Sequence, residues 1–374
     1  MFTDYLEAGS WSESTLRANR VALDRLQLRQ RVAVDVSHRS TITSILGEPA
    51  ALPLAMSPLG LLGMQHADGE IHAALACQRF GVPFTLSTMS ICSIEDVAAS
   101  GAPFWFQLYL MRDRGLVARL IDRAAAAGCR VLVLTLDLQV LGVRHRDVAN
   151  GLSAPPRPTL RNLLDLLRRP AWCLGMLGAR RRDFGNLAGE VPQGTDTRSL
   201  ASWIETQFDP SMTWDDVAWV RQRWPGKLVL KGILDADDAR LALRCGADAL
   251  VVSNHGGRQL DGAPASIDAL PAVLDAVGSS AEVHLDSGIR SGQDIFRALA
   301  HGARAVHAGR ALGYGLGAGG GAGVCRALQI LHTELDRTMA LTGRTRVGDI
   351  DASALFHPLA ATAAPAARPD PPRP

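Results

Sequence analysis

The sequence predicts a (β/α)8 barrel, and three observations support this fold class. Eight short apolar runs recur along the chain, at 52–56, 82–86, 103–108, 130–136, 228–230, 249–252, 282–285 and 305–308. Segments of helical composition, without apolar–polar alternation, lie between these runs. Strands that are apolar throughout are typical of a parallel sheet buried on both faces, and eight strand–helix units fit a closed barrel.

Helix signals follow the apolar runs in order. The helical segments cover 69–79, 94–100, 115–127, 235–245, 267–277 and 291–301. Ser93 is a candidate N-cap, and the carboxylates of 235–238 favour a helix start because they lie at the positive end of the helix dipole. The glycine-rich stretch 313–323 follows the last run without the strand and helix context of a nucleotide loop, and we expect a flexible turn there.

One connection is far longer than the others. It covers roughly 138–224, and an excursion of this length is typical of an active-site lid, a partner-binding insertion or disorder. We treat it as an insertion after the fourth strand of a single domain, residues 1–359. Residues 360–374 are rich in Ala and Pro, and we expect a disordered tail there.

Composition excludes several classes of protein. The chain has 39 Lys and Arg residues against 37 Asp and Glu residues, a net charge of +2, which is too balanced for a nucleic-acid binder. No apolar run is long enough to span a bilayer. The six cysteines are far apart, so neither a disulfide framework nor a metal site is predicted. The acidic N-terminus does not resemble a signal peptide, and we expect a cytoplasmic protein with a small-molecule substrate.

Polar side chains end every apolar run, where this fold places its chemistry. Polar residues commonly terminate strands, but a lysine, a histidine and an aspartate that leave buried strands together are costly to desolvate without a partner or a task. The strand-end residues are Ser57, Ser87, Thr88, Gln107, Tyr109, Thr135, Asp137, Lys231, Ser253, Asn254, His255, Asp286, Ser287, Arg290 and Arg310. The remaining histidines have no evident partners, and we expect surface or packed positions for them: His38, His66, His72, His284, His301, His307, His332 and His357.

Arginines near the strand ends predict anionic ligands. Arg144 and Arg258 follow the fourth and sixth strands, and their planar guanidinium groups suit a carboxylate. The segment 286–290 and the pair Gly309 and Arg310 follow the last two strands, where such barrels bind phosphate. A phosphorylated cofactor or substrate is therefore predicted.

Three motifs carry a resemblance to a known family. They are SNHGGRQLD at 253–261, LKGI at 230–233 and DSGIR at 286–290, and the segments 106–109 and 134–137 agree with them. From residue 5 to about 351, the chain resembles the FMN-dependent L-2-hydroxy acid dehydrogenase/oxidase family, which includes L-lactate dehydrogenase (cytochrome), mandelate dehydrogenase and glycolate oxidase. The resemblance implies an FMN-binding (β/α)8 barrel.

The resemblance also implies residue roles. His255 would be the base on the substrate's 2-hydroxyl or α-carbon, with Asp137 stabilising the imidazolium. Lys231 would lie beside the flavin, where a fixed cation stabilises negative charge. Substrate contacts would come from Tyr5, Tyr109, Arg144, His255 and Arg258. FMN contacts would come from Ser57, Pro58, Leu59, Gly60, Ser87, Gln107, Thr135, Lys231, Ser253, Asp286, Ser287, Gly288, Arg290, Gly309 and Arg310.

Two departures from the family pattern stand out. Family members usually have further helical residues before the tyrosine that corresponds to Tyr5, so we expect Tyr5 to be weakly anchored. The family's Ala-Pro-Thr before the small flavin-facing residue reads Ser57-Pro-Leu here, which keeps Gly60 but loses a hydroxyl.

The segment 157–182 predicts a membrane contact. It holds seven arginines and one aspartate, interleaved with leucines and Trp172, a pattern that suits an anionic membrane surface. A helix that packs its leucines on the barrel is an equally open alternative. We expect peripheral association with the inner face of the plasma membrane, a quinone or cytochrome as electron acceptor and, by family analogy, a homotetramer.

Two alternative functions remain open. One is a 2-hydroxy acid oxidase that reduces O2 to H2O2. The other is a catalytically idle FMN-binding module, against which the complete set of His255, Asp137, Arg144, Arg258 and Lys231 argues.

Overall fold

The predicted (β/α)8 barrel is confirmed in the computed structural model, which describes residues 2–149, 164, 166–188 and 206–356. Eight strands form one parallel sheet in the order β3-β10-β9-β8-β7-β6-β5-β4. A parallel bridge between Met56 and Phe84 joins the two end strands and closes the barrel. The strands are β3 (Leu54–Met56), β4 (Thr85–Ser87), β5 (Trp105–Tyr109), β6 (Val131–Thr135), β7 (Lys227–Ile233), β8 (Ala249–Val252), β9 (Glu282–Asp286) and β10 (Ala305–Ala308).

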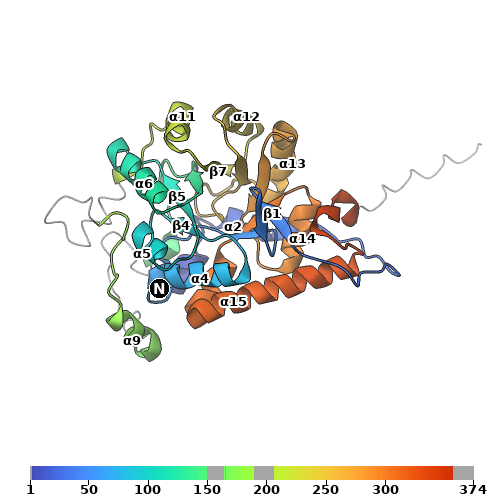
Figure 1. The fold of residues 1–374 in the computed structure, drawn as a ribbon, viewed down its shortest axis with the longest axis horizontal. Helices are drawn as coiled ribbons and strands as arrows, with labels where there is room; N and C mark the ends of the chain where they lie inside the picture. The colour runs from blue at the N-terminus through green and yellow to red at the C-terminus, as the bar shows by residue number, and fades with distance from the viewer. Residues whose placement is uncertain (1, 150–163, 165, 189–205, 357–374) are drawn as a thin grey trace, which may run out of the picture.

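A helix follows each barrel strand and lies outside the sheet (Figure 1). Ser93 caps α5 in a reciprocal capping box with Asp96, as its sequence position predicts. The helices after the strands are α4 (Gly69–Phe80), α5 (Ile94–Ala99), α6 (Arg114–Ala126), α11 (Trp214–Arg223), α12 (Ala236–Arg244), α13 (Ser266–Val277), α14 (Gly292–Ala300) and α15 (Arg310–Leu341).

The flexible turn expected at 313–323 is wrong, because these residues lie inside α15. The helix breaks at Gly319 and Gly320, and Gly320 has a positive φ of 57°. The two halves meet so closely that a Cβ on Gly323 would lie 1.8 Å from the carbonyl oxygen of Gly315. These glycines therefore permit a backbone contact that no side chain could tolerate.

Further elements lie outside the eight strand–helix units. They are α1 (Phe2–Glu7), α2 (Ser14–Arg25), β1 (Thr43–Ile45), β2 (Glu48–Ala50), α3 (Leu62–Gln65), α7 (His145–Ala149), α9 (Pro170–Gly178), η1 (Val347–Asp349) and η2 (Ala352–Ala354). The antiparallel β1–β2 hairpin packs Ile45 and Ala50 against Ala305, the first residue of β10. It thus closes the barrel floor, at the amino ends of the strands.

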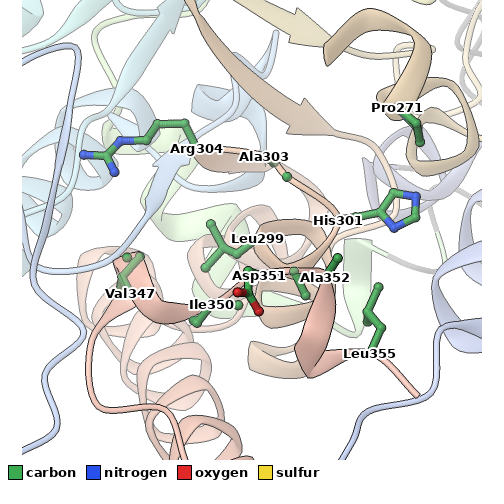
Figure 2. Close-up of a pocket in the computed structure, with 13 residues that line it drawn as sticks. Pro271, Leu299, His301, Ala303, Arg304, Val347, Ile350, Asp351, Ala352 and Leu355 are labelled. Carbon is green, nitrogen blue, oxygen red and sulfur yellow. The ribbon is translucent and has the colours of Figure 1, made fainter. Parts of the chain in front are cut away.

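A pocket of about 540 Å³ lies at the same end of the barrel (Figure 2). Its walls come from the α14–β10 turn, which includes His301 and Arg304, and from the C-terminal segment with Val347, Ile350 and Asp351. Arg304 directly precedes β10, so the pocket opens opposite the carboxyl ends of the strands.

Candidate active site

His255 lies at the barrel mouth, at the carboxyl end of β8. It follows β8 in the left-handed backbone region, with φ 58°, and its amide N–H donates to Ser253 Oγ at 3.0 Å. Its Nδ1 lies 2.8 Å from Asp137 Oδ1. An ionised carboxylate only accepts hydrogen bonds, so Nδ1 carries the proton and Nε2 of the neutral ring has a free lone pair.

Asp137 is fixed by its surroundings as an ionised acceptor. Gly232 on β7 leaves it space, since a Cβ there would lie 2.8 Å from the Asp137 side chain. Burial opposes ionisation, but the interaction and hydrogen bond with His255 and the positive charge of Lys231 hold the pKa of Asp137 below its usual value. Its Oδ2 is buried and has no hydrogen-bond partner within the described part of the chain.

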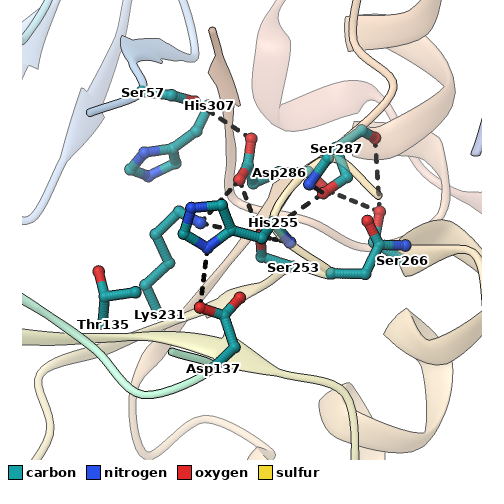
Figure 3. Close-up of polar contacts among 12 residues, drawn as sticks. Ser57, Thr135, Asp137, Lys231, Ser253, His255, Ser266, Asp286, Ser287 and His307 are labelled. Atoms are coloured by element: carbon teal, nitrogen blue, oxygen red, sulfur yellow. Dashed lines mark hydrogen bonds and ion pairs between the residues drawn. The ribbon is translucent and has the colours of Figure 1, made fainter. Parts of the chain in front are cut away.

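Lys231 and Asp286 form a buried ion pair beside this histidine (Figure 3). Lys231 Nζ lies 3.0 Å from Asp286 Oδ2 and donates to Ser253 Oγ at 2.9 Å. Asp286 also accepts hydrogen bonds from Ser253 and Ser57, at 2.8 and 3.1 Å. Burial disfavours both charged forms, but the opposite charge of each partner outweighs it. The pKa of Asp286 is therefore held well below its usual value, and the pKa of Lys231 is raised above its usual value.

A chain of buried polar side chains crosses β4, β5 and β6. Ser87 Oγ donates to Gln107 Oε1 at 3.1 Å, and Gln107 Nε2 donates to Thr135 Oγ1 at 3.0 Å. Thr135 pairs in register with Lys231 on β7. The predicted cofactor residues of four adjacent strands therefore form one polar surface.

Arg258 and Arg144 carry positive charge at the mouth. The Arg258 guanidinium lies 4.8 Å from the Tyr5 ring centroid, and the Arg144 Nε pairs with Asp147 at 2.6 Å. Burial and the neighbouring Arg144 lower the pKa of Arg258. An anion bound between the two guanidinium groups would relieve this repulsion.

Tyr5 is firmly held, contrary to the weak anchoring expected from the sequence. Arg258 Nη1 donates to the carbonyl oxygens of Tyr5 and Ala8 at 2.6 and 2.9 Å. The Tyr5 hydroxyl lies 3.3 Å from where a Cβ on Gly60 would stand, so it reaches the loop after β3. Tyr109 ends β5, and burial together with the Asp137 charge raises the pKa of its hydroxyl.

Arg310 contacts the N-terminal segment. It donates to the carbonyl oxygens of Leu6, Gly256 and Ala8 at 2.5, 2.9 and 3.1 Å. Burial and the nearby charges of Arg258 and Arg290 lower the pKa of Arg310 to about 9. Positive charge thus accumulates at the N-terminus of α15, where Gly309 is the N-cap.

The other residues of the predicted phosphate site surround this point. Arg290 stacks its guanidinium over the Tyr314 ring at 5.4 Å. Ser287 and Gly288 have positive φ values of 83° and 89°. Such a turn directs backbone N–H groups to one side, as anion sites require.

These residues fit a flavin mononucleotide by their chemistry. The polar chain from Ser87 to Thr135 supplies donors and acceptors, and Lys231 supplies a fixed cation. The unpartnered Asp137 Oδ2 leaves an acceptor available to a bound group. The α15 N-terminus with Arg290 and Arg310 suits a phosphate.

The sequence reasoning assigned no role to three residues that hold the site together. Asn254 exchanges two hydrogen bonds with Asn19 of α2, at 2.9 and 2.7 Å. Gln259 Nε2 donates to the carbonyl of Asp137 at 2.8 Å. Asp261 accepts hydrogen bonds from the residues around the N-terminus of α2, including the backbone of Thr15 at 2.9 Å. All three residues belong to the 253–261 motif, and this motif was the sequence signal that could have identified them.

Comparisons with known proteins agree with this geometry. Residues 1–357 match the family described as FMN-dependent dehydrogenase. The L-lactate dehydrogenase of Acinetobacter baylyi is 45% identical over 354 residues, 94% of this chain and 92% of the relative. That of Xanthomonas campestris pv. campestris is 47% identical over 354 residues, with 94% and 91% covered.

Solved structures give the same result. The monotopic membrane protein (S)-mandelate dehydrogenase superposes with a TM-score of 0.89 at 36% identity, with 94% of both chains covered. Mandelate oxidase superposes with a TM-score of 0.79 at 38% identity, with 94% of this chain and 92% of the other covered. This chain therefore belongs to the FMN-dependent dehydrogenase family.

Proposed function

We propose that this chain oxidises L-lactate, or an aryl analogue such as mandelate, to the 2-oxo acid and passes the electrons to a membrane quinone or cytochrome. The chain is an FMN-dependent L-2-hydroxy acid dehydrogenase; the choice of acid, the acceptor and the residue roles are the proposal. The observation that carries it is the His255–Asp137 pair, which presents a free Nε2 next to a buried lysine and two arginines.

The chain's own residues perform the proton and charge steps. Arg144 and Arg258 bind the substrate carboxylate, and Tyr5 and Tyr109 donate hydrogen bonds to the substrate. His255 Nε2 removes a proton, and Asp137 Oδ1 stabilises the imidazolium through Nδ1–H. Bound FMN supplies the two-electron acceptor for this oxidation.

Residues from all sides of the mouth would hold the cofactor. The isoalloxazine would be held by the loop of Ser57, Pro58, Leu59 and Gly60 and by the side chains of Ser87, Gln107, Thr135, Lys231 and Ser253. The phosphate would be held by Asp286, Ser287, Gly288, Arg290, Gly309 and Arg310. Lys231 would supply a fixed positive charge that stabilises negative charge on the reduced cofactor.

Anaerobic mixing tests the substrate class. Stopped-flow absorbance should show flavin bleaching with L-lactate or (S)-mandelate, and none with D-lactate as the matched control. Bleaching by the D-acid alone, or by no 2-hydroxy acid in the panel, contradicts the proposal. The second result favours an idle FMN-binding module.

A membrane-bound acceptor is supported by the segment around α9. Figure 1 shows α9 projecting from the barrel body. Leu167, Leu174 and Leu177 are 73%, 70% and 72% exposed, and Arg168 and Arg180 are also exposed. Large apolar side chains beside basic residues suit an anionic membrane surface. The alternative, in which these leucines pack on the barrel, does not fit these exposures.

Three contacts fix this segment relative to the barrel. Trp172 Nε1 donates to the Met64 carbonyl at 3.1 Å, and Arg181 pairs with Asp68 and Asp96 at 2.8 Å each. The described helices include none with the length and apolarity needed to cross a bilayer. The exposed leucines and arginines of this segment lead us to propose peripheral binding at the inner face of the plasma membrane, with 157–182 as the contact. Residues 157–163 and 165 of that segment lie outside the described residues.

Vesicle co-sedimentation tests this contact. The double variant Leu174→Glu, Leu177→Glu should lose binding to anionic phosphatidylglycerol vesicles. The control Ile42→Glu replaces a side chain that is 71% exposed near the barrel floor, and it should bind like the wild type. Equal binding of all three proteins rules out 157–182 as the contact.

Reoxidation of the reduced enzyme distinguishes the acceptors. We expect a soluble quinone or a cytochrome to reoxidise the flavin faster than air-saturated buffer does. One H2O2 formed per turnover in air, with no faster artificial acceptor, identifies an oxidase instead. The homotetramer carried over from the family is checked by light scattering.

A further inference from the structure

A file of three polar side chains lies inside the barrel, beneath the candidate site. Glu282 and His284 are on β9, and His307 is on β10. His284 Nε2 lies 3.0 Å from Glu282 Oε2, and His284 Nδ1 lies 3.1 Å from His307 Nε2. Both imidazoles are at most 1% exposed, although the neighbouring interior cluster is Val131, Val133, Val229, Ala249 and Val251. Burying two histidines there is costly unless they are hydrogen-bonded.

The donor and acceptor roles of these three side chains determine which ring nitrogens carry a hydrogen. The Glu282 carboxylate accepts, so His284 Nε2 carries a hydrogen. When His284 is neutral, its Nδ1 has a lone pair and His307 must donate from Nε2. His307 Nδ1 is then a bare acceptor, and it is buried without a hydrogen-bond partner among the described residues.

Adding one proton reverses the donor and acceptor roles in the hydrogen bond between His284 and His307. Protonated His284 donates from Nδ1, so His307 Nε2 must accept and His307 Nδ1 must carry the hydrogen. The charge stays on His284, beside the Glu282 carboxylate. Burial and the neighbouring His284 lower the pKa of His307 to about 3, so His307 itself remains neutral in both states.

The upper end of the file meets the Lys231–Asp286 pair. His307 pairs in register with Asp286, and Figure 3 shows its ring close to Asp286 and Lys231. The charges around the file are Glu282 and Arg304 at its lower end and Asp286 and Lys231 at its upper end. The Glu282 side chain is 26% exposed, so water reaches the lower end.

We propose that Glu282, His284 and His307 form a proton-binding file that takes up one proton from water when negative charge is added beside Lys231, with His307 as a positioning residue. The His307 Nε2–H bond breaks as its proton passes to His284 Nδ1, the added proton forms a new N–H bond at His307 Nδ1, and no electron moves within the file. The two events are thermodynamically linked. Negative charge beside Lys231 favours protonation of the file, and protonation of the file therefore favours the addition of that charge. The proposal rests on the proposed function in that FMN reduction is the event that adds the charge.

Potentiometric titration of the holoenzyme tests the file without turnover. One extra proton per two electrons changes the reduction equilibrium ten-fold per pH unit, about 30 mV. Over the pH range in which the holoenzyme stays folded, we expect the wild-type midpoint potential to fall with pH more steeply than that of His284→Gln, by up to this amount. Thr85→Val is the matched control, because Thr85 is also a buried polar residue on a barrel strand, and it should keep the wild-type slope.

Equal slopes for wild type and His284→Gln overturn the proposal, and so does the same loss of slope in Thr85→Val. A second measurement covers the case in which His284→Gln does not bind flavin. Nitrogen NMR of histidine-labelled wild-type holoenzyme should show His307 Nδ1 gaining a hydrogen on chemical reduction, and an unchanged tautomer overturns the file. Both readouts use an electrode or dithionite, so failure of hydroxy acids to bleach the flavin leaves this test intact.

Discussion

The Asp137 carboxylate alone positions the Nδ1 proton of His255. Substitution of His255 therefore tests the proposed base directly. We predict that His255→Gln lowers the rate of flavin reduction by L-lactate by roughly 10²–10⁴-fold, because the amide cannot act as a base. Flavin content should stay close to wild type, since Lys231, Gln107 and Thr135 are unchanged. Stopped-flow reduction measures the rate, and the exposed His38→Gln is the control. A wild-type rate in His255→Gln would remove this residue from the chemistry.

At the level of single residues, the sequence indicates which side chains reach the mouth but not which atoms they contact. Arg310 was expected beside a phosphate, yet three of its N–H groups bind backbone carbonyls of Leu6, Ala8 and Gly256. Carbonyl contacts across such sequence distances leave no trace in residue type. His284 and His307 were expected at surface or packed positions, and only the folded barrel shows that they contact each other.

Among the elements, α15 shows why glycines can be structural inside a helix. We predict that Gly323→Ala destabilises the fold by roughly 2–3 kcal/mol or prevents folding, because its Cβ would lie 1.8 Å from the Gly315 carbonyl oxygen. Gly317→Ala is the control: its Cβ would meet only Gln65 Oε1 at 3.7 Å, so it should be neutral or stabilising by up to about 1 kcal/mol. Urea unfolding measures both variants. Equal stabilities would mean that the two halves of α15 do not touch there.

Element positions were largely predictable because barrel strands are apolar throughout. Each predicted run overlaps its observed strand, and 249–252 and 305–308 coincide with β8 and β10. The β1–β2 hairpin was not predicted, since three-residue strands are too short to show alternation. The helix over 313–323 was not predicted because glycine has a low helix propensity. The close contact between the two halves of α15 nevertheless requires glycine at these positions.

For the whole molecule, the buried Lys231–Asp286 pair governs stability against pH. Asp286 has a lowered pKa, so its contribution is fully present above its unfolded value of about 4 and is lost as the pH falls toward the folded value. Lys231 has a raised pKa, so its contribution is present below about pH 10 and is lost as the pH rises through the folded value. Both contributions are complete between these limits.

Removing one partner leaves a buried charge. We predict that Asp286→Asn lowers the free energy of unfolding at pH 7 by roughly 3–5 kcal/mol. This deficit should shrink below about pH 4, where Asp286 of the unfolded wild type takes up a proton while the folded carboxylate stays ionised. Urea unfolding across pH measures the effect. Asp24→Asn, whose side chain is 60% exposed, should stay within about 0.5 kcal/mol of wild type. A deficit that persists unchanged in acid would assign it to packing.

The overall architecture, including the closure of the barrel, follows from counting strands and helices. The order of the eight strands is the order of the chain, so a cyclic sheet is the simplest solution. The 138–224 excursion was recognisable by length alone. Its contacts with the barrel, such as Arg181 with Asp68, depend on tertiary geometry that no local pattern encodes.

The bonds from Arg310 to Leu6 and Ala8 join the N-terminal segment around α1 to the last strand–helix unit of the barrel. A growing polypeptide makes α1 first but cannot seat it until β10 and the start of α15 have left the ribosome, because the partners are 304 residues apart. The mouth is therefore capped at the end of synthesis, after the inner polar surface has been assembled. The flavin can thus enter the barrel mouth during synthesis, before α1 closes over it.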